Sequence, residues 1–220
     1  MLPADKSGSA PLVVGVDRWA GRWVAVALRG GAFACASVFA AMPALLDAFA
    51  DAAAIGVDIP IGLPLSGRRA CDVAAARLLG PRRSSVFATP AREILDQPFR
   101  AGLGVSAQAH ALRGAITEVA PLAAAAAGRV FEVHPEVSFL SMAGAPLPHR
   151  KKSWSGMWQR LRLLDAEGIR LPRRLGEAGL AAADDLLDAA AAAWTAARYA
   201  RGEARCLPDG ATGGEPVIWY

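Results

Sequence analysis

Three short apolar runs in this chain each lead directly into an acidic residue. The pairs of run and acid are Val13–Val16 before Asp17, Ala54–Val57 before Asp58, and residues 128–131 before Glu132. Each run is rich in β-branched or small apolar residues and is bounded by turn-forming residues, so each predicts a short, mostly buried strand. An ionised carboxylate is costly to bury without a partner. We therefore expect these acids at strand ends, where water, a partner or a cation reaches them.

The ends of strands in open α/β sheets are also where ligands bind. Two or three carboxylates that converge there would form an oxygen-rich site suited to Mg²⁺ or Mn²⁺. The alternative for any single acid is that it only caps a turn. That alternative explains one of these acids more easily than it explains all three.

The first sixty residues predict a particular order of elements. After the strand that ends at Asp17, residues 22–28 and 33–39 read as two further strands, and the Gly30-Gly31 pair supplies the positive φ angles of a tight hairpin. Pro43 opens a helix at about 44–52, which leads into the strand before Asp58. The sequence thus predicts a three-stranded antiparallel meander, followed by a crossover to a strand parallel to the first.

The rest of the chain alternates helices with less regular segments. Helices are predicted over 71–79, 106–127 and 181–201, a last edge strand over 217–220, and irregular structure over about 134–174. We see no internal repeat and no low-complexity linker. The interpretation is one α/β domain over residues 1–220, with the irregular segment as an insertion.

The predicted last helix carries three aspartates, Asp184, Asp185 and Asp188. Asp188 shares a helix face with both of the others, because residues three and four apart are neighbours on a helix. Acids in a first turn also stabilise the positive end of the helix dipole, which accounts easily for Asp184. It accounts less well for Asp188, which lies one turn further along among apolar residues.

Composition narrows the class of protein. The formal charge of +4 and pI near 9.3 permit a polyanionic partner without requiring one. The three cysteines have no metal-ligand spacing, which argues against a disulfide framework and a structural zinc and for a reducing compartment. Residues 1–10 lack the apolar core of a signal peptide, and no apolar stretch reaches the length of a membrane span. We expect a cytoplasmic protein without a membrane segment.

Basic residues gather in two stretches, around 68–83 and at 150–152. Most of them are expected to form a solvated face, but Arg82 and Lys152 are the candidates for phosphate contacts. Trp154 and Trp158 lie four residues apart beside the second stretch. Such a pair could stack on bases, although we favour a small core beneath a loop.

Several motifs along the chain resemble those of one family. They are Gly15-Val16-Asp17; Asp58-Ile59-Pro60-Ile61-Gly62-Leu63-Pro64; Arg69-x-Cys71-Asp72; Arg82-x-Ser84-Ser85-Val86-Phe87 with Pro90; Glu132-x-His134-Pro135-Glu136-x-Ser138-Phe139; Lys152 with Gly156; and Asp184-Asp185-x-x-Asp188-Ala189. Together they resemble the predicted RNase H-like nucleases grouped as domain of unknown function 429, relatives of the RuvC and YqgF resolvases. The resemblance extends from about Leu12 to Trp219.

This resemblance implies an RNase H-like α/β fold: a mixed five-stranded sheet with its first three strands antiparallel, flanked by helices. It also implies that Asp17, Asp58, Asp185 and Asp188 form a catalytic, metal-binding cluster for two Mg²⁺ or Mn²⁺ ions, one activating water and the other stabilising the leaving oxygen. Glu132, His134, Glu136 and Asp184 are additional candidates. One departure is that Asp58 is shorter than the glutamate that resolvases have there.

The function that follows is a metal-dependent nuclease acting on DNA or RNA. The sequence leaves open whether a homodimer is needed to cut two strands. Two alternatives stay open: a non-catalytic nucleic-acid or partner-binding module on the same fold, and a small-nucleotide phosphohydrolase. Convergence of the aspartates with open access would favour an enzyme, and a salt-bridged or plugged cluster would favour the module. Nucleotide-binding glycine motifs, a GxSxG elbow and a matched Cys/His pair are absent from the sequence.

Overall fold

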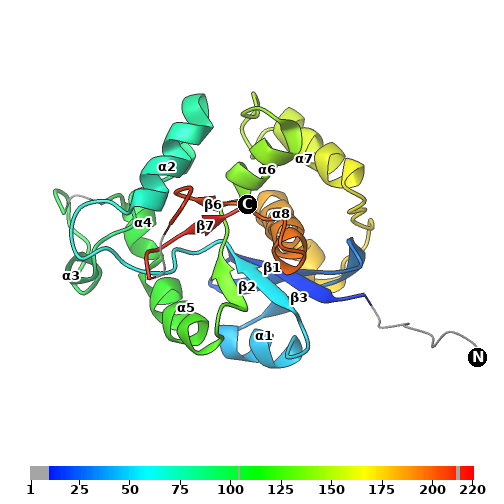
Figure 1. Ribbon diagram of the computed structural model, residues 1–220, viewed down its shortest axis with the longest axis horizontal. Helices are drawn as coiled ribbons and strands as arrows, with labels where there is room; N and C mark the ends of the chain where they lie inside the picture. The colour runs from blue at the N-terminus through cyan, green and yellow to red at the C-terminus, as the bar shows by residue number, and fades with distance from the viewer. Residues whose placement is uncertain (1–9, 104, 212–213) are drawn as a thin grey trace, which may run out of the picture.

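The computed structural model describes residues 10–103, 105–211 and 214–220 (Figure 1). The prediction about a signal peptide concerns residues that lie almost wholly outside these ranges. The centre of the fold is a five-stranded sheet of order β3-β2-β1-β4-β5. The strands are β1 (Leu12–Trp19), β2 (Arg22–Arg29), β3 (Ala32–Phe39), β4 (Ala54–Val57) and β5 (Val130–Glu132).

Strand directions follow the predicted topology. β1, β2 and β3 form an antiparallel meander, whereas β4 and β5 run parallel to β1. The two hairpin turns carry positive φ at Ala20 and Gly21 and at Gly30 and Gly31, as two-residue hairpin turns require. This is the mixed sheet of the RNase H-like fold.

Asp17 does not lie at the end of its strand as predicted. It is paired with Val24 inside β1, and the antiparallel hairpin continues to the pair Trp19 and Arg22. The parallel pairing between β1 and β4, however, ends at Val16 and Val57. Asp17 and Asp58 therefore both follow the last parallel pair, and the two acids are neighbours for the reason that the sequence indicated.

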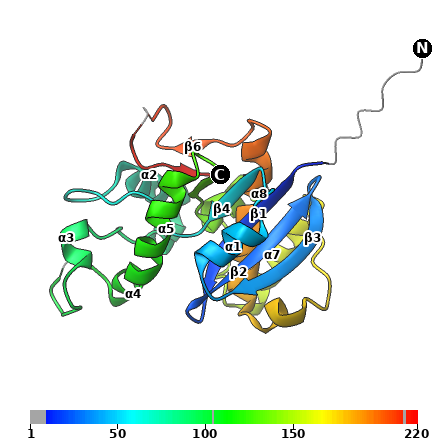
Figure 2. The same ribbon diagram turned by 90° about the horizontal axis from the view of Figure 1, so that it is seen from below.

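Helices cover both faces of the sheet (Figures 1 and 2). Val14, Val16 and Ile55 pack on the face that holds α1 (Met42–Ala48) and α5 (Arg113–Ala125). Val13 and Val24 pack on the opposite face, where α8 (Ala183–Ala200) lies with α6 (Pro135–Ala143) and α7 (Trp154–Ala166) outside it. Successive residues of β1 point to opposite faces of the sheet, and both sets are apolar because the strand is buried on both sides.

The backbone of α8 lies directly on the sheet. A Cβ atom on Gly15 would come within 2.0 Å of the carbonyl oxygen of Ala189, and one on Gly56 within 2.9 Å of that of Ala192. Glycine on the strands and alanine on the helix thus allow an approach that larger side chains would prevent. This approach places the first turns of α8 beside the ends of β1 and β4.

We expect Gly15→Ala to destabilise the protein by about 3 kcal/mol or more, because its Cβ would meet helix backbone rather than a flexible side chain. Gly114→Ala is the matched control, since it lies in a helix with nothing within 4 Å of the added Cβ. Chemical denaturation of both variants measures the effect. Equal stability of the two variants would contradict the close approach of α8.

Two predicted segments differ from the structure. The helix predicted over 106–127 is divided at Leu112 into α4 (Ala107–Ala111) and α5. The segment 134–174 is not irregular, since it contains α6 and α7. Prolines and glycines suggested loops there, but Pro135 occupies a first helical turn, where proline is tolerated, and Gly144 ends α6 with a left-handed φ.

Short elements complete the fold. They are α2 (Ala70–Leu79), η1 (Gly80–Ser85), α3 (Arg92–Leu95) and η2 (Gly176–Leu180), and a small sheet of β6 (Cys206–Leu207) with β7 (Ile218–Trp219). The predicted C-terminal edge strand therefore pairs mainly with β6, and a backbone bridge between Val133 and Trp219 joins it to the residue after β5. Within the described residues, each helix is too short or too polar to cross a bilayer.

Candidate metal centre

Three of the predicted acids meet at one point. One carboxylate oxygen from each of Asp17, Asp58 and Asp188 lies within 4.8 Å of the other two. Asp17 and Asp188 are buried and Asp58 is half-buried. Their elements are β1, the residue after β4, and the second turn of α8, so the close packing of α8 on the sheet creates the cluster.

The cluster lies in a cavity of about 820 Å³. Of the other predicted site residues, Asp185, Glu132, His134, Glu136 and Arg82 also line this cavity, whereas Asp184 and Lys152 do not. The cavity thus gathers most of the candidate residues, and it is large enough for a small ligand or a segment of a larger one.

The electrostatics of the cluster favour a cation. Burial raises the pKa of Asp17 and Asp58 well above its ordinary value, and the neighbouring carboxylates raise it further. Burial also raises the pKa of Asp188 to about 6, although Lys151 opposes the shift. Because their pKa values are higher in the folded protein than in the unfolded chain, these groups contribute stability that is fully present below about pH 4. That contribution is lost as the pH rises through the folded-state pKa values.

The donor set fits a hard divalent ion. All three groups are carboxylates, the ligands that Mg²⁺ and Mn²⁺ prefer. Asp188 Oδ1 is buried and has no hydrogen-bond partner among the described residues. A cation held by these oxygens would supply that partner and offset the repulsion among the three negative charges.

Lys151 already supplies one positive charge to the cluster. Its Nζ lies 2.5 Å from Asp188 Oδ2 and 3.8 Å from Asp184 Oδ2, with 35% of the side chain exposed. Burial disfavours the charged lysine, but Asp188 and Asp58 outweigh that effect and raise the pKa of Lys151 above its ordinary value. One lysine balances only one of the three carboxylates.

The remaining acids of α8 have different surroundings. Asp184 is buried and lies 3.8 Å from both Lys151 and Lys152. Asp185 is half-buried and lines the cavity, but does not belong to the close set of three. Lys152, expected to bind phosphate, is 80% exposed beside Asp184 and outside the cavity.

Arg82 is better placed for an anion than Lys152. Its Nε donates to the carbonyl oxygen of Leu147 at 2.8 Å, which holds the side chain at the cavity. Its buried Nη2 has no hydrogen-bond partner among the described residues. A phosphate oxygen would satisfy that donor.

Glu132 pairs with Arg69 and does not belong to the aspartate cluster. Both of its carboxylate oxygens accept hydrogen bonds from Arg69 at 2.7 Å, and one also accepts from the backbone of Ile61 at 2.7 Å. Arg69 is itself paired with Asp72, at 2.5 and 3.1 Å. Three of the motifs named above therefore meet in one buried ionic network, which holds the proline-rich loop, α2 and β5 together.

His134 and Glu136 also have partners. His134 Nε2 lies 3.4 Å from the carbonyl oxygen of Ser85, and burial lowers the pKa of the ring. Glu136 accepts a hydrogen bond from Arg160 at 2.5 Å. Both residues line the cavity but are engaged in holding neighbouring segments.

Sequence reasoning missed two features of this site. In the sequence Lys151 is one of three consecutive basic residues, and no spacing rule connects it to Asp188, 37 residues away. Arg69 lies in the basic stretch 68–83 that predicts a solvated face, but its side chain is buried. The signal available for Arg69 was its place in a motif that also contains Asp72.

Residues 15–213 match a family model described as "Protein of unknown function (DUF429)". The chain belongs to this family. A solved structure of Thermus thermophilus RuvC is similar to this DUF429 protein, with 14% identity, 87% of this chain and 97% of that chain covered, and a TM-score of 0.40. A likeness of that size supports no conclusion about activity. A comparison with curated proteins found no match.

Proposed function

We propose that this DUF429 protein is a nuclease that hydrolyses phosphodiester bonds with Mg²⁺ or Mn²⁺ held by Asp17, Asp58 and Asp188. The observation that carries the proposal is the convergence of these three carboxylates within 4.8 Å at an open cavity. A divalent ion in such a site activates water and neutralises charge on a phosphate group.

The residues around the cluster suit a phosphate substrate. Arg18, Arg82 and Arg150 line the cavity together with the acids. Their guanidinium groups would bind the phosphate oxygens and orient the bond to be cut, while Asp185 lies within the same cavity as a further carboxylate. The basic composition of the chain is consistent with a nucleic-acid partner.

The Lys151–Asp188 ion pair favours a second candidate, the non-catalytic binding module, because it partly satisfies the cluster without a metal. The two candidates differ in one respect. A nuclease must exchange the Lys151 contact for a divalent ion, whereas a module keeps it.

A panel of labelled single-stranded, duplex, hybrid and junction substrates, together with free nucleotides, incubated with Mn²⁺ tests the proposal. We expect wild type to cut at least one substrate and Asp17→Asn to bind it but leave it intact. Binding by wild type without any cleavage would transfer the assignment to the binding module. Cleavage of free nucleotides alone would support the phosphohydrolase.

A further inference from the structure

Two tryptophans on α7 are exposed, contrary to the small core expected for them. Trp154 is 71% exposed and Trp158 is 47% exposed. Their ring centroids lie 5.7 Å apart at an interplanar angle of 78°, so they contact each other edge to face on the surface. A pair of exposed indole rings indicates a surface that a partner covers.

The tryptophans border a hollow of about 660 Å³. Ser155, Gln159 and Arg162 supply polar groups to its lining, Leu163 and Ala166 supply apolar ones, and none of its lining residues is acidic. Aromatic faces beside hydrogen-bonding groups suit a planar, polar-edged ligand such as a nucleobase.

The loop before α7 and the first part of that helix are rich in basic residues. Residues 149–164 contain no Asp or Glu and contain five basic residues: Arg150, Lys151, Lys152, Arg160 and Arg162. Arg160 and Lys151 are paired with Glu136 and Asp188, whereas Arg150, Lys152 and Arg162 are exposed, with Lys152 Nζ 3.8 Å from Asp184 Oδ2. The part of this surface formed by residues 149–162 is therefore positive, as contact with a polyanionic strand requires, whereas the exposed acids Asp165 and Glu167 flank Ala166 of the hollow in the sequence.

The hollow and the carboxylate cavity share one loop. His149 lines the hollow and Arg150 lines the cavity. Arg160 Nη1 fixes this loop to α7 by donating to the carbonyl oxygens of His149, at 3.3 Å, and Gly156, at 3.0 Å. A Cβ on Gly156 would lie 1.9 Å from the Arg150 carbonyl oxygen, so the loop backbone packs closely on the first turn of α7.

We propose that the hollow binds unpaired bases of single-stranded nucleic acid, with Trp154 and Trp158 stacking on the bases and Arg150, Lys152 and Arg162 contacting the backbone. This inference rests on the proposed function. The loop that the hollow and the cavity share would lead such a strand from the hollow to the carboxylate cluster. A duplex offers its phosphates but keeps its bases stacked inside, so it gains only the electrostatic part of the interaction.

The test is fluorescence anisotropy with labelled DNA of about 16 nucleotides, single-stranded or duplex, in EDTA. We expect wild type to prefer the single strand and the double variant Trp154→Ala/Trp158→Ala to bind it about 10- to 100-fold more weakly, with duplex binding changed less than threefold. Leu180→Ala is the matched control, because Leu180 is 72% exposed on η2, outside the hollow. It is expected to bind like wild type.

Unchanged single-strand binding by the double variant, or an equal loss on single strand and duplex, would overturn the proposal. Thermal unfolding of the double variant checks that it folds, as expected for exposed side chains. Because EDTA removes any metal, this result does not depend on cleavage. Tryptophan-dependent binding without cleavage in Mn²⁺ would support the hollow and reject the nuclease.

Discussion

Asp188→Asn is expected to reduce Mn²⁺-dependent phosphodiester cleavage by about 10³-fold, equivalent to about 4 kcal/mol of transition-state stabilisation. The substitution removes one of three carboxylates that meet within 4.8 Å and leaves the shape of the side chain nearly unchanged. The rate of cleavage of the best substrate at saturating Mn²⁺ is the measurement.

Asp184→Asn is the matched control for that variant. Asp184 lies on the same helix, is also buried and also approaches Lys151, but does not line the cavity. We expect its rate to stay within about threefold of wild type, since only an outlying charge is lost. If both variants lose activity equally, the loss comes from the helix as a whole and the assignment of Asp188 is wrong.

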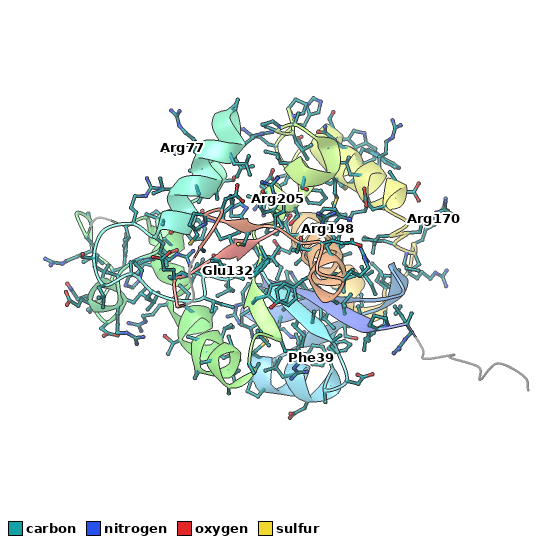
Figure 3. All side chains as sticks on the ribbon, viewed as in Figure 1. Phe39, Arg77, Glu132, Arg170, Arg198 and Arg205 are labelled. Carbon is teal, nitrogen blue, oxygen red and sulfur yellow. The ribbon has the colours of Figure 1, made fainter. Side chains whose placement is uncertain are left out.

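Arg69→Met is expected to lower the free energy of unfolding by about 3–5 kcal/mol, because it leaves two buried carboxylates without their shared cation. Glu132 and Asp72 lie against Arg69 and are both buried (Glu132 is labelled in Figure 3). Arg77→Met, on the exposed part of α2, is the control and is expected to change stability by less than about 0.5 kcal/mol.

A second variant separates lost charge balance from lost packing. Adding Glu132→Gln to Arg69→Met removes one of the unpaired charges, so we expect the double variant to regain part of the stability. Urea denaturation of the four proteins gives the comparison. A double variant that is less stable than Arg69→Met would show that the network acts through packing rather than charge.

The central sheet could be predicted because short stretches of sequence determine its strands and turns. Gly30-Gly31 defines one hairpin, and the apolar runs before Asp17 and Asp58 define two adjacent parallel strands. From those runs alone, the meeting of Asp17 and Asp58 follows. The extension of β1 past Asp17 could not be predicted, since it depends on pairing with β2 beyond the last pair with β4.

The choice among the aspartates of α8 needed the structure. Residues 187–197 of α8 are buried, and most of them are alanine, so no polar face reveals which side of the helix meets the sheet. Asp188, rather than Asp184 or Asp185, joins the cluster because α8 packs on Gly15 and Gly56. These glycines are far from α8 in the sequence.

α7 was missed for a different reason. Its basic residues and exposed tryptophans obscure the apolar stripe, although Ser153 is a helix N-cap that accepts from Gly156 N at 3.1 Å. Asp188 lies 37 residues from Lys151 and Glu132 lies 63 residues from Arg69, beyond any local pattern, whereas the Arg69–Asp72 pair is local.

Titration of the metal-free protein with Mn²⁺ by calorimetry near pH 7 tests the central claim most directly. We expect wild type to bind Mn²⁺ and to gain thermal stability on binding, because the ion offsets repulsion among Asp17, Asp58 and Asp188. Asp17→Asn is expected to bind at least about tenfold more weakly. It is also expected to be more stable than wild type without metal, since it removes one of the crowded negative charges. Equal Mn²⁺ binding by the two proteins would contradict the carboxylate cluster as the metal centre.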